Sequence, residues 1–158
     1  MIWRHAVSSS YVKIWVNISI GGKSVKPICY TIEPPEDFAQ LHSLYEALGW
    51  DSLQLSVDDL KQMCDQSWYA VYAFDDQKLV GMGRIISDGV ITGMICGLCV
   101  LPSYQSKGIG KELLNRMIDH CGQNRVIPQL LCTENLESYY ESCGFKKFSV
   151  GMTRNIIR

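Results

Sequence analysis

Apolar and polar residues alternate along the N-terminal part of the chain. Such period-two alternation is typical of a β-strand, and it runs through Val12, Ile14, Val16, Ile18 and Ile20. Gly21-Gly22 predicts a turn, and residues 28–32 predict a second short strand. We therefore expect residues 1–27 to form an N-terminal extension that adds a strand to a single domain of residues 28–158.

Four segments show the spacing of amphipathic helices. They cover residues 35–48, 57–65, 109–121 and 134–143. Ser56 is a good N-cap for the second helix. Helices commonly end at a glycine in the left-handed conformation. We expect such a glycine at the end of each of the other three helices: Gly49, Gly122 and Gly144.

Five further segments read as strands. They are residues 68–74, 78–86, 90–101, 126–132 and 145–154. Gly93 and Gly97 interrupt the longest of them, and glycine inside a strand indicates a bulge or the close approach of a ligand. The order of strands and helices predicts one mixed α/β (α+β) domain.

The charge balance excludes some classes of partner. The 158 residues carry 15 basic and 16 acidic side chains, which gives a net charge of −1. This balance leaves no electrostatic footprint for nucleic acid or for an anionic membrane. The first residues lack the uninterrupted apolar run of a signal peptide, and we expect a cytoplasmic protein.

The cysteines also predict a reducing compartment. Their number is seven, which is odd, and several lie inside apolar runs. Cys96 and Cys99 form a C-x-x-C, but a zinc site needs a second pair. Residues three apart on a strand also point to opposite faces. We therefore predict packing roles for the cysteines and no metal site.

A glycine-rich turn lies between the long apolar strand and the third helix. It reads Gln105-Ser106-Lys107-Gly108-Ile109-Gly110. A helix start offers unpaired N–H groups and the positive end of the dipole. The glycines allow close approach of an anion, and Lys107 and Lys111 add positive charge. A pyrophosphate site fits this pattern, although a tight strand-to-helix connection explains the glycines as well.

Two motifs together resemble the GCN5-related N-acetyltransferase (GNAT) superfamily. The first reads Val100-x-Pro102-x-Tyr104-Gln105-x-x-Gly108-Ile109-Gly110, and the second reads Tyr139-Tyr140-Glu141-x-x-Gly144-Phe145. Leu41-x-x-Leu44-Tyr45-x-x-x-Gly49-Trp50 is similar to the family's first helix and substrate loop. The resemblance covers about residues 28–154. It implies a twisted, mixed, mostly antiparallel sheet of six to seven strands with about four helices and a splay between strands 4 and 5.

The resemblance implies that acetyl-CoA binds without a metal. The backbone of the glycine-rich turn would hold the pyrophosphate through Gln105, Ser106, Lys107, Gly108, Ile109, Gly110 and Lys111. The pantetheine arm would pair with the sheet beside Leu98, Cys99 and Val100. A backbone N–H near Val100 would stabilise the oxyanion.

The family match also assigns side chains. Tyr140 matches the tyrosine that protonates the departing thiolate in many members, whereas Tyr139 would pack or line the substrate site. Trp50, Asp51 and Arg84 are further candidates for the acceptor site. Met94 stands where some members carry a glutamate base, so the base is open. Glu134 is a candidate, but a carboxylate that stabilises a helix N-terminus is the better explanation of this residue.

We expect acetyl transfer to a primary amine, most simply a small molecule. Protein acetylation at a lysine or an N-terminus is an alternative within the family, and a non-catalytic CoA-binding regulatory module is an alternative from another class. The alternating residues 1–27 suggest an edge strand that pairs within a homodimer.

Overall fold

The computed structural model describes residues 14–16, 27–50 and 52–153 of the chain. Its sheet has six strands in the spatial order β1-β2-β3-β4-β5-β6. They are β1 (Ile14–Val16), β2 (Ile28–Thr31), β3 (Tyr69–Asp75), β4 (Lys78–Ser87), β5 (Thr92–Val100) and β6 (Ile127–Leu130). Only β5 and β6 pair in parallel, and the other neighbours are antiparallel. The predicted mixed, mostly antiparallel sheet is confirmed.

The described residues form four α-helices and two short 3₁₀ helices. They are α1 (Ala39–Ala47), α2 (Val57–Asp65), α3 (Ile109–Gln123), α4 (Glu137–Ser142), η1 (Pro102–Tyr104) and η2 (Glu134–Leu136). Ser56 caps α2 through a capping box with Asp59, as its position predicts. The prediction began α1 four residues too early and ended it one residue too late. Asp37 accepts a hydrogen bond from the Ala39 N–H, and the helix starts at Ala39.

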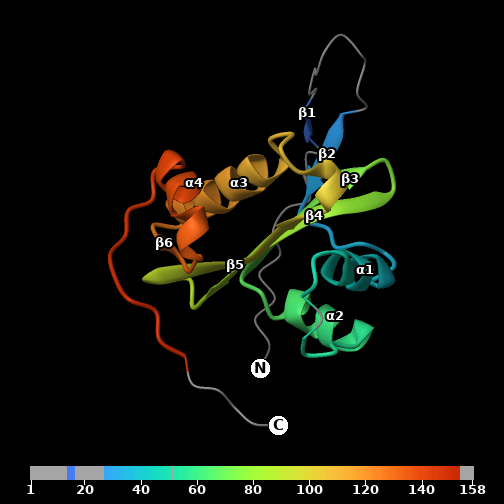
Figure 1. Cartoon of the computed structure of the whole chain (residues 1–158), viewed down its shortest axis with the longest axis horizontal. Helices are drawn as coiled ribbons and strands as arrows, with labels where there is room; N and C mark the ends of the chain where they lie inside the picture. Colours follow the sequence, from blue (N-terminus) through green and yellow to red (C-terminus); the bar gives the residue numbers. More distant parts are fainter. Residues whose placement is uncertain (1–13, 17–26, 51, 154–158) are drawn as a thin grey trace.

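The helices cover the sheet on two faces (Figure 1). On one face, α3 packs against an apolar cluster that includes Val80, Ile85 and Ile95. On the other face, α1 and α2 pack against Tyr72, Met82 and Cys99. The alternation of the strands produces these two cores, because successive side chains point to opposite faces.

The predicted strand over residues 145–154 is wrong for the part that the structure describes. Residues 145–153 have no strand assignment. Phe148, Val150 and Met152 have the alternation of a strand, but they are between 68% and 96% exposed. A strand needs a hydrogen-bonded neighbour as well as a pattern, and no described strand pairs with this segment.

A bulge interrupts β5. Met82 pairs with Cys99 and Arg84 pairs with Cys96, so Gly97 and Leu98 together lie opposite Gly83. Gly97 has φ +61°, the left-handed conformation that such a bulge places on glycine. The extra residue also corrects our expectation for the C-x-x-C: Cys96 and Cys99 both lie near Tyr45, on the same face of the sheet.

The expected splay lies between β5 and β6. These strands pair only from Thr92–Ile127 to Ile95–Leu130. β5 continues for five more residues, through Cys96 to Val100, with no described strand beside it on that side. The two strands therefore diverge beyond Ile95.

β1 is the described part of the N-terminal extension. It pairs with β2 over three residues, and the other residues of the predicted strand 12–20 lie outside the described part. Among the described residues, none of the helices has the length and apolar character to cross a membrane.

Candidate active site

A cavity of about 210 Å³ opens at the diverging ends of β5 and β6. It is lined by residues from the end of β5, the start of α3, α4 and the end of α1: Leu48, Trp50, Leu98, Cys99, Val100, Gln105, Gly110, Leu136, Tyr139 and Tyr140. The sequence motifs named eight of these ten residues. Leu48 and Leu136 were missed, because their apolar character at the end of a helix signals packing as much as a site.

The glycine-rich turn forms the N-terminus of α3. Ser106 and Gly108 adopt positive φ values of +60° and +82°, and Gly108 is the N-cap of the helix. No atom lies within 4 Å of the position that a Cβ on Gly108 would take. The turn therefore presents backbone and the positive end of the α3 dipole to open space, as anion binding requires.

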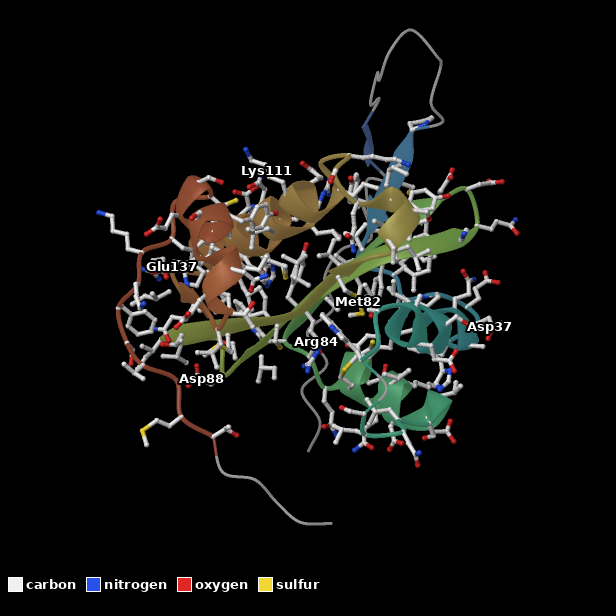
Figure 2. All side chains as sticks on the ribbon, viewed as in Figure 1. Asp37, Met82, Arg84, Asp88, Lys111 and Glu137 are labelled. Carbon is white, nitrogen blue, oxygen red and sulfur yellow. The ribbon has the colours of Figure 1, made fainter. Side chains whose placement is uncertain are left out.

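Side chains at both ends brace this turn. The Gln105 side-chain amide donates to the Val100 carbonyl at 3.0 Å, which ties the turn to the end of β5. Lys107 donates to the Ser103 carbonyl at 2.8 Å and lies over the Tyr104 ring. Figure 2 shows Lys111 at the start of α3 with its side chain directed away from the sheet. Positive charge therefore surrounds the turn, while Ile109 is buried in the core.

Tyr139 and Tyr140 both border the cavity. Tyr140 is half-buried, and its ring packs edge-on against Phe145 with a centroid distance of 6.0 Å. Burial raises the pKa of Tyr140, with Cys132 and Cys143 adding to the rise. Its hydroxyl is therefore protonated at neutral pH.

The Tyr139 hydroxyl points toward the start of α3. A Cβ on Gly110 would lie 3.8 Å from this hydroxyl oxygen. Tyr139 is 38% exposed, and burial of the rest of its side chain raises its pKa. Adjacent helical residues point about 100° apart. The two tyrosines therefore line different parts of the same cavity.

The predicted acceptor residues are separated in the structure. Trp50 lines the cavity and packs edge-on against Tyr45 at 5.6 Å. Asp51 lies outside the described residues. Arg84 does not line the cavity; its Nε lies beside Gly97 at the bulge.

The described lining residues provide no carboxylate and no imidazole. Glu134 is exposed in η2, and Met94 is half-buried opposite Gln129. Neither of them reaches the cavity, so the position of a base stays open. Nor do the described residues bring three or more His, Cys, Asp or Glu side chains together as metal ligands.

The family of the chain follows from a comparison with family models. Residues 29–145 match the Acetyltransferase (GNAT) family. The chain belongs to this family. The match includes the strands, the glycine-rich turn and the tyrosine motif that build the cavity, and it ends at Phe145.

Individual GNAT relatives agree with this assignment. GCN5-related N-acetyltransferase 3, chloroplastic, of Arabidopsis thaliana is 38% identical over 77 residues, which are 48% of this chain and 32% of that protein. An uncharacterized N-acetyltransferase, ycf52-like, of Prochlorococcus marinus is 28% identical over 116 residues, 69% of this chain and 62% of the relative. The chain thus spans less than two thirds of the length of these curated relatives.

The solved GNAT structures share the fold. The paia N-acetyltransferase of Thermoplasma acidophilum, solved in complex with coenzyme A, superposes with a TM-score of 0.66. The sequences are 19% identical, and the match covers 78% of this chain and 92% of that one.

Proposed function

We propose that the protein transfers an acetyl group from acetyl-CoA to a primary amine. The unpaired edge of β5 beyond Ile95 carries this proposal, because the glycine-rich turn and two tyrosines converge on it. The turn would bind the pyrophosphate through the backbone from Gln105 to Lys111. The open backbone of residues 98–100 would pair with the pantetheine arm, as an added strand pairs with a sheet edge.

Acetyl-CoA supplies an activated thioester, and the amine attacks it directly in a ternary complex. The amine nitrogen forms a bond to the acetyl carbon, and the bond from that carbon to sulfur breaks. A backbone N–H near Val100 would stabilise the charge that develops on the acetyl oxygen. Tyr140 would give its proton to the departing thiolate. The proton of the attacking amine leaves to water, and Tyr140 regains its own proton from solvent.

The chemistry of the lining supports a neutral amine as the reacting form of the acceptor. No described lining side chain can accept its proton near neutral pH. The raised pKa of Tyr140 keeps the acid in its protonated form over the pH range in which amines become neutral. We therefore propose that the rate rises with pH as the free amine form increases.

A small acceptor fits the described cavity, because its volume is about 210 Å³ and drug-sized ligands occupy larger pockets. Acceptance of a protein lysine or N-terminus is the alternative within the family.

All seven cysteines are free, which supports a reducing compartment such as the cytoplasm.

The test is steady-state release of coenzyme A thiol with a panel of amines and lysine peptides, beside a thermal-shift titration with acetyl-CoA. We expect a melting temperature that rises with ligand concentration and turnover that depends on the amine. Binding without turnover of any amine would instead identify a regulatory module. Absence of any thermal shift at millimolar acetyl-CoA would contradict both.

A further inference from the structure

Arg84 is the most unusual charged residue of the described part. It lies in β4 opposite Cys96, and its Nε is buried without a hydrogen-bond partner. No described carboxylate forms an ion pair with it. Buried donors in folded proteins are almost always paired, and a guanidinium stays charged at any physiological pH. The position therefore lacks an acceptor.

The described groups around Arg84 do not neutralise its charge. The Tyr45 hydroxyl donates a hydrogen bond to the Met63 sulfur at 3.5 Å. Burial raises the pKa of Tyr45 to about 12 and also raises the pKa values of Cys64 and Cys96. These neighbours are neutral near pH 7, so the guanidinium faces an uncharged, half-buried environment.

Arg84 lies outside the cavity lining, but a short series of contacts connects it to the cavity. Its Nε and the Tyr45 hydroxyl would lie 3.5 Å and 3.3 Å from a Cβ on Gly97, so both flank the bulge. Tyr45 in turn contacts Trp50, which lines the cavity. Figure 2 shows Arg84 between the sheet and the layer that contains α2. The glycine-rich turn and α3 belong to the other face of the sheet. A molecule bound beside Arg84 would therefore lie across β5 from the proposed pantetheine arm.

We propose that the acceptor amine carries a carboxylate that binds Arg84. This inference rests on the proposed acetyl transfer and specifies its substrate class as small amino carboxylic acids. The fork of a guanidinium matches the two oxygens of a carboxylate, and a bidentate pair satisfies Nε and one terminal nitrogen together. One carboxylate balances the single positive charge of the guanidinium.

The first test needs no turnover. Full-length protein saturated with coenzyme A is titrated with N-acetylglycine, N-acetyl-β-alanine and N-acetyl-4-aminobutyrate, and with the neutral amide of each. The observable is the nitrogen-15 NMR signal of the Arg84 Nε–H, identified by its loss in Arg84→Lys. We expect at least one acid to shift this signal saturably, with affinity about 10- to 100-fold higher than its amide. If no acid shifts it, or if acids and amides act equally, the proposal is wrong.

The second test compares variants in the thiol-release assay. Arg84→Gln should lower the preference for amino acids over their amides about 10- to 100-fold, through KM rather than kcat. Arg116→Gln is the matched control, because Arg116 lies on α3 and pairs with Glu112 at 2.8 Å. It should leave the preference unchanged.

The two tests separate the two proposals. Turnover of amines without any preference for carboxylates would remove the role of Arg84 and leave acetyl transfer intact. A selective NMR shift without turnover of any amine would support the carboxylate site and refute acetyl transfer. A preference that survives Arg84→Gln would overturn the assignment to this residue.

Discussion

Replacement of Tyr140 by Phe should lower turnover and leave the fold intact. The change removes one oxygen and keeps the ring contacts to Phe145 and Tyr139. The hydroxyl forms no hydrogen bond within the described part of the chain, so no partner is left unsatisfied. The free energy of unfolding should therefore change by less than about 1 kcal/mol.

The size of the kinetic effect follows from the proposed role. A positioned general acid contributes about 10²- to 10⁴-fold, which corresponds to roughly 3–5 kcal/mol in the activation barrier. The loss should fall on kcat, because the proton matters as charge develops on sulfur. The affinity for acetyl-CoA should change little.

Tyr139→Phe is the control for the same ring chemistry in the same cavity. Its hydroxyl lies over Gly110, away from the ring contact that Tyr140 makes with Phe145. We expect less than about a tenfold loss of kcat, since no proton transfer is assigned to it. The assay is thiol release at saturating amine for wild type and both variants, with thermal melts of each. Equal, small losses at both positions would leave water as the proton source, and a large loss only at Tyr139 would reverse the assignment.

Three further predictions test the rest of the structure. Gly108→Val should abolish the acetyl-CoA-dependent rise in melting temperature. The φ of residue 108 is +82°, and the valine side chain would fill the open space at the turn. Normal binding of acetyl-CoA by this variant would show that the cofactor does not bind at this turn. Burial raises the pKa values of Tyr30, Tyr45 and Cys99 to about 12. Their neutral forms stabilise the fold fully below pH 9, and this stability is lost as pH rises toward 12. The unfolded chain loses these three protons at lower pH than the folded protein, so the unfolding free energy should fall by roughly 3 kcal/mol per pH unit between pH 10 and pH 12. Urea titrations at pH 8 and 10.5 with equal midpoints would contradict this. Removal of residues 1–27 should preserve acetyl-CoA binding and disrupt any homodimer, so a truncated protein that remains dimeric in solution scattering would refute a dimer role for this segment.

Local signals explain why much of the fold could be predicted from the sequence. The bounds of α2 depend on a cap within the segment itself, and Ser56 provides it. The glycine-rich turn could also be predicted from local sequence, because it depends on residues that tolerate positive φ values and on the helix that follows. By contrast, the strand predicted after Phe145 depends on a neighbouring edge, and alternation of side chains carries no information about that edge.

The arrangement of residues around the end of β5 depends on the bulge at Gly97, and the periodicity of the sequence does not reveal this bulge. A regular strand would place residues 96 and 99 on opposite faces. The extra residue instead puts Ile95 and Val100 in the α3 core and leaves Cys99 with α1 and α2. One left-handed glycine thus changes which face of the sheet each later residue of β5 contacts, and it follows the last described pair between β5 and β6. The Arg84 Nε and the Tyr45 hydroxyl both lie beside this glycine. The bulge therefore lies between the two faces that we propose for the cofactor and the acceptor, and sequence motifs alone do not show that it connects them.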